Sequence, residues 1–358
     1  MTPRTAVFHD LVSGRMLGLG PMLARAGLGA VSLGYGTGVR LRNRLFDAGW
    51  KRRHRAGVPV VSVGNLTLGG TGKTPCVEYL GRFYLERQVR VALLSRGYGG
   101  GGGPNDEALL LSENLPGVPH LQGADRVGLA AVAVNELKAE LLILDDGFQH
   151  RRLARDLDIV LMDATDPFGH GRLFPRGLLR EPPSALKRAH AVLLTRCDQV
   201  SERQVCDLIE RVRQLAPARP IVPTTHAPVG WLQNGRPERP VEAIRGRPVA
   251  AFCGIGNPEA FRRTLRNVGV EPIAFRTFGD HHRYTAADLD RLEAWADEQR
   301  SEVTMVTTQK DLVKLRRDRI GERDLLALRV GLQIRPGADA NEFHRRLERF
   351  SPRSMTGG

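Results

Sequence analysis

The sequence contains little cysteine and has no hydrophobic run long enough to cross a bilayer. Its four cysteines form no CxxC pair, which argues against a structural zinc site and favours a reducing compartment: Cys76, Cys197, Cys206 and Cys253. In the apolar segment near the amino terminus, the longest charge-free stretch is residues 26–39, with 14 residues. A spanning helix needs about 20. Aromatic residues make up only 6% of the chain and no nucleic-acid-binding module is recognisable, so nucleic acid is not an expected partner.

Acidic residues are outnumbered by basic ones, and the imbalance is concentrated near the amino terminus. The chain carries 53 lysines and arginines against 39 aspartates and glutamates, which gives a formal charge of +14. Residues 1–60 hold ten of the basic residues and only two of the acidic ones. Such a surplus points to an anionic partner, whether a membrane surface, nucleic acid or a phosphorylated substrate.

The basic cluster VRLRNRLFDAGWKRRHR at 39–55 follows an apolar, glycine-rich stretch. Phe46 and Trp50 lie among these cations, a composition that suits contact with anionic lipid headgroups. The same pattern also fits a helix that packs on a core and leaves a basic face in water. A cleaved signal peptide is not expected, because the residues before the apolar stretch are not cleanly basic. The sequence alone leaves the first two interpretations open.

A phosphate-binding loop is the most specific motif. The β-branched run VPVVSV at 58–63 predicts a buried parallel strand, and GNLTLGGTGKT at 64–74 leads from it into a helical pattern. This is the setting of a Walker A loop, although Thr67 stands where the strict pattern has its first glycine. We expect Lys73 and backbone N–H groups to bind nucleotide phosphates, and the Thr74 hydroxyl to ligate Mg²⁺. The loop residues concerned are Gly69, Gly70, Thr71, Gly72, Lys73 and Thr74.

A pair of carboxylates follows a second buried strand. In LLILDDGFQH the apolar residues 141–144 precede Asp145 and Asp146, which are placed to hold Mg²⁺ directly or through water. Further apolar runs alternate with helix or loop at 91–95, 158–164 and 191–196. This alternation predicts a doubly wound parallel α/β sheet of the P-loop NTPase class. ATP is favoured over GTP, because Arg196 stands where a guanine-binding motif has lysine.

The rest of the chain predicts a second, smaller α/β domain and several polar loops. Strand-like runs and an amphipathic helix recur in the carboxyl-terminal third, where FGDHHRYT places Asp280, His281 and His282 side by side. These histidines are surface residues, a metal-ligand pair for which no third ligand stands out, or a base or orienting group at a domain cleft. One polar segment carries three arginines that either face a phosphate or decorate the surface: Arg172, Arg176 and Arg180.

These motifs together resemble the tetraacyldisaccharide 4'-kinase family, the lipid A 4'-kinases of Gram-negative bacteria. The likeness covers most of the chain in order, through SVGNLTLGGTGKTP, LLSRGYGG, the NDE acid pair, GADRV, LDDGFQHRRLARDLDIVLMDA, FGHGRLFPRGLLREP, FGDHHRYT and TTQKDLVKL. It implies transfer of the γ-phosphate of ATP, with Mg²⁺, to the 4'-hydroxyl of tetraacyldisaccharide 1-phosphate. The implied partners are this lipid A precursor and the anionic membrane surface, at the cytoplasmic face of the inner membrane.

The resemblance also implies roles for individual residues. Asp106 and His281 match a carboxylate–histidine dyad that assists deprotonation of the acceptor hydroxyl, while Lys73 acts on the phosphates. The positions implied near the metal are Thr74, Asp145, Asp146, Glu107 and Gln149. Those implied at the lipid headgroup are Arg96, Tyr98, Arg126, His150 and His170. The chain departs from the family pattern at His170, usually asparagine, and at Gln309, usually glutamate, and its segment between Tyr98 and Asp106 is short.

We therefore expect residues 1–220 to form a P-loop kinase domain with an amino-terminal membrane-surface segment. Residues 221–246 are expected to form a linker with a hairpin, and 247–358 a smaller α/β domain that contributes the cleft histidine. A soluble P-loop ATPase or GTPase of the metal-chaperone or switch type is the main alternative, but it leaves FGDHH and the basic amino-terminal segment unexplained. A nucleic-acid-binding ATPase is a third, and the sequence offers no module for it.

Overall fold

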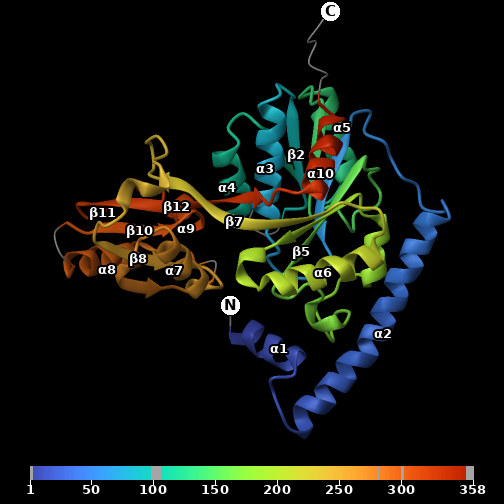
Figure 1. The fold of residues 1–358 in the computed structure, drawn as a ribbon, viewed down its shortest axis with the longest axis horizontal. Coiled ribbons are helices and arrows are strands. Elements are labelled where there is room, and N and C mark those ends of the chain that lie inside the picture. The colour runs from blue at the N-terminus through green and yellow to red at the C-terminus, as the bar shows by residue number, and fades with distance from the viewer. Residues whose placement is uncertain (1–2, 98–105, 281, 300–301, 352–358) are drawn as a thin grey trace, which may run out of the picture. The chain divides into compact units, whose positions relative to one another are not determined.

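The computed structural model describes residues 3–97, 106–280, 282–299 and 302–351, which fall into two compact units (Figure 1). The larger unit comprises Phe8–Gly102, Leu111–His226 and Leu332–Gly358. The smaller unit comprises Met1–Val7, Gly103–Leu110 and Ala227–Gly331. Two strands run from one unit into the other, and each unit is described by itself below.

The larger unit is built on a parallel sheet with the strand order β3-β2-β4-β1-β5-β6-β7. The strands are β1 (Val60–Asn65), β2 (Val91–Ser95), β3 (His120–Gln122), β4 (Leu141–Asp145), β5 (Leu157–Asp163), β6 (Ala191–Thr195) and β7 (Ile221–Leu232). All residues of β1, β2, β4 and β6 are buried, as expected of parallel strands covered on both faces. The predicted doubly wound sheet is confirmed, and the carboxyl ends of its strands meet at one edge.

Helices cover both faces of this sheet. Alternate strand residues such as Val61 and Val63 pack with α3 (Lys73–Leu85) and α10 (Ala338–Glu348). The other face packs against α5 (Arg126–Asn135) and α6 (Glu202–Leu215). The helix α3 therefore starts directly above the carboxyl end of β1, which fixes the position of the loop between them.

The carboxyl-terminal end of the chain differs from the predicted domain boundary. The sequence interpretation placed 247–358 in the smaller domain, whereas Leu332, Phe343 and Leu347 are part of the core of the larger unit. The Tyr84 hydroxyl of α3 also donates to the Leu347 carbonyl at 3.1 Å. The apolar stripe of an amphipathic helix shows that it is buried but does not identify its partner, so the sequence pattern could not assign α10.

The smaller unit contains a second parallel sheet, with the order β12-β10-β8-β9 and β11 antiparallel to β12. Its strands are β8 (Val249–Cys253), β9 (Pro272–Thr277), β10 (Thr304–Thr308), β11 (Arg319–Ile320) and β12 (Arg323–Ile334), and its helices are α7 (Pro258–Asn267), α8 (Ala286–Asp297) and α9 (Gln309–Leu315). The predicted smaller α/β fold is confirmed. The region predicted as a linker starts instead as strand β7, and its hairpin closes through a bridge between Trp231 and Arg239.

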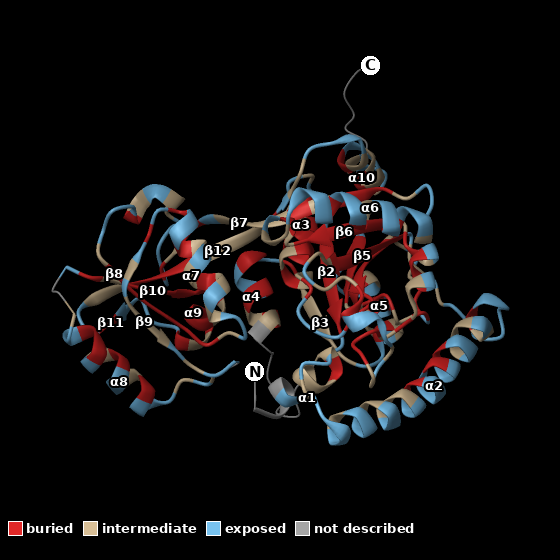
Figure 2. Ribbon diagram, turned by 60° about the horizontal axis from the view of Figure 1, so that its bottom comes forward, coloured by how far each residue is buried: buried red, intermediate tan, exposed pale blue. Residues whose placement is uncertain are grey.

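The long helix α2 (Leu19–Asp47) has 29 residues, which makes it about 43 Å long. Its buried residues, Ser32, Gly36, Val39 and Phe46, form a single stripe, and most of the remaining surface is exposed (Figure 2). Within the described residues, no helix is both long and apolar enough to pass through a bilayer. The helix follows α1 (Pro3–Ser13) in the chain.

Candidate active site

The loop predicted to bind phosphate lies between β1 and the amino terminus of α3. Gly72 is the residue that precedes the helix, in the left-handed conformation with φ of 85°. A Cβ atom there would lie 2.6 Å from Nε2 of His226, so any other residue would be strained in this backbone conformation and would also have to displace the imidazole. The backbone N–H groups of the first helical turn have no partner inside the helix, and the helix dipole attracts negative charge to them. This geometry is that of an anion-binding site for nucleotide phosphates.

Three charged side chains meet at the carboxyl edge of the sheet beside this loop. Nη1 of Arg180 lies 2.9 Å from each carboxylate oxygen of Asp146, and Nζ of Lys73 lies 3.7 Å from Oδ1 of the same residue. Burial acts to raise the pKa of the Asp146 carboxyl, but the charges of Lys73 and Arg180 outweigh it and hold that pKa below its usual value. Asp146 is therefore ionised at neutral pH and holds both cations in place.

Arg180 reaches the site because its segment is paired with the residues that lead into the phosphate-binding loop. Thr67 and Leu179 form an antiparallel bridge. Around it, the Leu68 amide donates to the Leu178 carbonyl and the Arg180 amide donates to the Leu66 carbonyl, both at 2.7 Å. Of the three arginines left open by the sequence, Arg180 thus faces the phosphate loop. Arg176 instead donates to the Val12 carbonyl at 3.0 Å.

Oxygen donors suited to Mg²⁺ gather at the same edge. Asp145 ends β4 opposite Val63 of β1 and is 8% exposed. Burial and, next, the charge of Asp145 raise the pKa of the Cys76 thiol, so this carboxylate lies near the start of α3, where Thr74 is buried. Gln149 Nε2 donates to the Asn65 carbonyl at 3.0 Å. A hydroxyl, carboxylates and an amide are ligands that Mg²⁺ accepts together with water and substrate phosphates.

The described part of the chain contains no ready-made group of three or more His, Cys, Asp or Glu side chains around a metal position. Mg²⁺ sites of nucleotide-binding proteins use few protein ligands and complete their shell with phosphates and water. The residues present at the edge of the sheet therefore suit the metal implied by the motif.

Sequence reasoning missed a set of contacts from β6. Nη2 of Arg196 donates to the Gly70 carbonyl at 2.7 Å, and the Thr195 hydroxyl donates to the Thr71 carbonyl at 3.0 Å. Arg196 is itself ion-paired with Asp163 at the end of β5. These side chains hold the phosphate-binding loop from a neighbouring strand. The available signal was a threonine and an arginine at the end of the run 191–196, which the sequence interpretation used only to favour ATP over GTP.

The residues implied at the lipid headgroup do not all converge. Nη1 of the buried Arg126 donates to the Asp146 carbonyl at 2.9 Å. Burial, helped by Arg126, lowers the pKa of His150 to about 4, so this nearby imidazole is neutral at pH 7. Arg96 is exposed directly after β2, and His170 is exposed in a short turn. Among the described residues of this set, Arg126 and His150 border the Asp146 loop.

The implied dyad falls largely outside the described residues. His281 and Tyr98 lie outside them, and only the backbone of Asp106 is described, at the start of α4 (Asp106–Asn114). Glu107 follows in the first turn of this helix and is half-buried. The neighbouring His282 has a structural contact: its Nε2 lies 3.0 Å from Oδ2 of Asp288, which caps α8.

Comparisons with known proteins identify the family to which the chain is similar. The family model described as Tetraacyldisaccharide-1-P 4'-kinase matches residues 24–350. The chain is 42% identical over 353 residues to a tetraacyldisaccharide 4'-kinase of Anaeromyxobacter sp. (strain Fw109-5), covering 92% of each chain. It is 41% identical over 309 residues to that of Syntrophus aciditrophicus, covering 79% of this chain and 82% of the relative.

A solved structure gives the same result for the fold. The crystal structure of the "apo" form of LpxK from Aquifex aeolicus in complex with ATP matches with a TM-score of 0.74 and 30% sequence identity. The match covers 92% of this chain and all of that one.

His226 makes the site sensitive to acid. Its Nε2 atom is shielded from solvent and has no hydrogen-bond partner among the residues that the structure describes. Burial and, to a lesser degree, the charge of Arg196 lower the pKa of His226 to about 4 from an ordinary value of 6.5. A neutral imidazole therefore packs against the phosphate-binding loop at pH 7.

We expect His226→Gln to flatten the dependence of stability on pH. Between pH 6.5 and 4 the unfolded chain binds a proton at His226 that the folded chain does not, so the free energy of unfolding falls as the pH drops. Removing the imidazole should reduce that fall by roughly 2–3 kcal/mol, as 1.36 kcal/mol corresponds to one pKa unit. Urea denaturation at several pH values measures it, and parallel curves for the two proteins would contradict the assignment.

Proposed function

The chain belongs to the tetraacyldisaccharide-1-phosphate 4'-kinase family, and from this membership we propose that it transfers the γ-phosphate of ATP to the 4'-hydroxyl of tetraacyldisaccharide 1-phosphate. The observation that supports the proposal is the cluster of Lys73, Asp146 and Arg180 beside the amino terminus of α3. It provides a site for a triphosphate at the carboxyl edge of a parallel sheet. Membership also favours the kinase over the metal-chaperone and nucleic-acid-binding alternatives.

The residues of the loop bind and orient the nucleotide. The N–H groups that open α3 and the Lys73 ammonium are placed to bind the phosphates, while Thr195 and Arg196 keep the loop backbone in one conformation. Arg180 lies within reach of the same phosphates, because it shares the Asp146 carboxylate with Lys73. Stabilisation of charge by fixed cations is the principal contribution of a protein to phosphoryl transfer.

Thr74, Asp145, Asp146 and Gln149 are the residues that would hold Mg²⁺. When bound, the ion supplies positive charge to the phosphate oxygens. Lys73 and Arg180 keep the Asp146 carboxylate ionised, which is the form in which its oxygens could ligate a metal. Glu107 remains a proposed member of this group on the basis of its position in the family motif.

The acceptor hydroxyl must lose a proton when it attacks the γ-phosphate. We assign this step to Asp106 and His281, whose support is their match to the family's carboxylate–histidine dyad. A carboxylate held against an imidazole fixes the ring tautomer and raises its basicity, which suits a general base. The structural contact of His282 with Asp288 supports the choice of His281 within the pair.

The proposed location is the cytoplasmic face of the inner membrane, with α2 at the lipid surface. Six apolar side chains in α2 are more than half exposed: Leu19, Met22, Leu23, Val31, Leu33 and Leu41. They lie on the helix whose carboxyl-terminal part carries the first half of the basic cluster, and this combination favours attachment to anionic lipid. The attachment would bring the active site to a substrate whose acyl chains are in the bilayer.

The kinase assignment is tested by following label from γ-labelled ATP into detergent-dispersed tetraacyldisaccharide 1-phosphate. We expect labelled lipid from the unaltered protein and almost none from Lys73→Ala. His281→Ala should lower kcat about 10²- to 10⁴-fold with little change in KM for ATP, since general base catalysis contributes this much. Arg172→Ala, an exposed change in the Arg180 segment, is the matched control. Label released only as inorganic phosphate, or an unchanged kcat for His281→Ala, would contradict the respective assignment.

The membrane role of α2 is tested by replacing Leu19, Met22 and Leu23 with serine. Because burial of each such side chain is worth about 1.5–3 kcal/mol, we expect binding to anionic vesicles to weaken at least 10-fold while ATP affinity stays the same. Leu137→Ser/Ile273→Ser removes exposed apolar groups elsewhere and serves as the control. Equal losses in the two variants would show that α2 has no special contact with lipid.

A further inference from the structure

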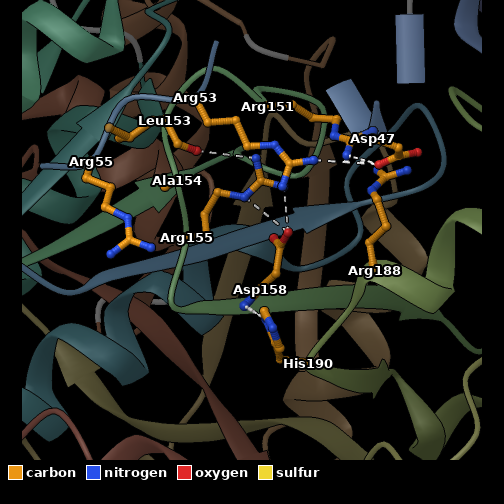
Figure 3. A pocket seen from close by; sticks show the side chains of 10 residues that line it. All are labelled: Asp47, Arg53, Arg55, Arg151, Leu153, Ala154, Arg155, Asp158, Arg188 and His190. Carbon is orange, nitrogen blue, oxygen red and sulfur yellow. Dashed lines mark hydrogen bonds and ion pairs between the residues drawn. The ribbon is translucent and has the colours of Figure 1, made fainter. Parts of the chain in front are cut away.

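A second cationic site lies in the larger unit, away from the nucleotide. It is a cavity of about 530 Å³ at the carboxyl-terminal end of α2. Five arginines line it, namely Arg53, Arg55, Arg151, Arg155 and Arg188 (Figure 3). No role in the proposed phosphoryl transfer uses these residues, so the cavity needs an explanation of its own.

The cavity is at the amino-terminal edge of the sheet. Asp158 is the second residue of β5, His190 directly precedes β6, and Arg55 lies in the segment that leads into β1. The phosphate-binding loop follows the opposite, carboxyl end of β1. A parallel strand of six residues spans about 20 Å. The cavity and the nucleotide site therefore lie at opposite ends of the strands, about one strand length apart.

Positive charge in the cavity exceeds negative charge. Arg155 is paired with Asp158 at 2.7 Å, and Arg188 with Glu181 at 3.0 Å. Asp47 is the carboxylate that remains for the guanidinium groups of Arg53, Arg55 and Arg151. In Figure 3, no hydrogen bond or ion pair is drawn between Arg55 and the other lining residues. Five arginines thus face three carboxylates, an excess of about two positive charges that a dianion would neutralise.

The cations are crowded around the Asp47 carboxylate. Arg151 donates to Asp47 at 2.5 Å, and Nη2 of Arg53 lies 3.6 Å from the same oxygen. Burial lowers the pKa of Arg151, and the charges of Arg188 and Arg53 lower it further against the pull of Asp47. An additional anion would relieve this repulsion.

We propose that this cavity is a binding site for a phosphate group, carried by an anionic lipid headgroup or by a soluble phosphate compound. Planar guanidinium groups donate pairs of hydrogen bonds that match phosphate oxygens. The cavity is larger than inorganic phosphate and admits a headgroup attached to it. Trp50 is 82% exposed and lies between Asp47, at the end of α2, and Arg53 in the chain. A side chain of this kind anchors proteins at the lipid interface.

The test compares two double substitutions that each remove two positive charges from the same turn. Arg53→Gln/Arg55→Gln alters the cavity, whereas Lys51→Gln/Arg52→Gln alters exposed residues that do not line it. Binding of inorganic phosphate is measured by calorimetry on the full chain, saturated with Mg²⁺ and a non-hydrolysable ATP analogue so that the phosphate-binding loop is filled. We expect the unaltered protein to bind phosphate at one site and the cavity variant to bind it at least 10-fold more weakly. The control variant should change less than threefold.

Flotation with phosphatidylcholine vesicles, with and without phosphatidylglycerol, then distinguishes the source. A selective loss of phosphatidylglycerol-dependent binding in the cavity variant assigns the site to a lipid headgroup. Retained vesicle binding with lost phosphate binding assigns it to a soluble phosphate compound. Equal effects of the two variants on phosphate affinity, or no binding by the unaltered protein, would overturn the proposal. Kinase turnover on detergent-dispersed acceptor is recorded in parallel, so that failure of the proposed activity is seen separately.

Discussion

The candidate site depends on one carboxylate, that of Asp146, which holds the cations Lys73 and Arg180 beside the phosphate-binding loop. Without Asp146, the charges of Lys73 and Arg180 would repel each other across a partly buried edge of the sheet. With it, both are fixed before any nucleotide arrives, and the electrostatic field that a triphosphate requires is already in place. Preorganised charge of this kind costs no rearrangement during the reaction.

The segment that carries Arg180 also connects the site to the amino-terminal helix. The Tyr35 hydroxyl of α2 donates to the Arg180 carbonyl at 2.9 Å, and Asn43 donates to the buried Glu181 at 2.6 Å. Glu181 in turn pairs with Arg188, which lines the second cationic cavity. The helix proposed to lie on lipid is therefore in direct hydrogen-bond contact with the segment that completes the nucleotide site.

Elements with a characteristic pattern of consecutive residues could be predicted from the sequence alone. Buried strands such as β1 and β4 are continuous apolar runs, and the Walker loop and Asp145 follow them directly, so fold and phosphate site were predictable. The packing of α10 on the larger unit was not, since an amphipathic stripe does not name its partner. The sequence left the role of Arg180 open and missed the loop contact of Arg196, because only pairing between distant segments brings these side chains to the loop.

Asp146 and Arg180 should be energetically coupled in the protein without nucleotide. A double-mutant cycle of Asp146→Asn and Arg180→Met, read as the free energy of unfolding in urea, measures that coupling directly. We expect a coupling of about 1.5–3 kcal/mol, the range for hydrogen bonds to a charged group. The same cycle with the exposed Arg172 in place of Arg180 should give a value near zero. A coupling near zero for Asp146 and Arg180 would show that the carboxylate does not hold this cation in place.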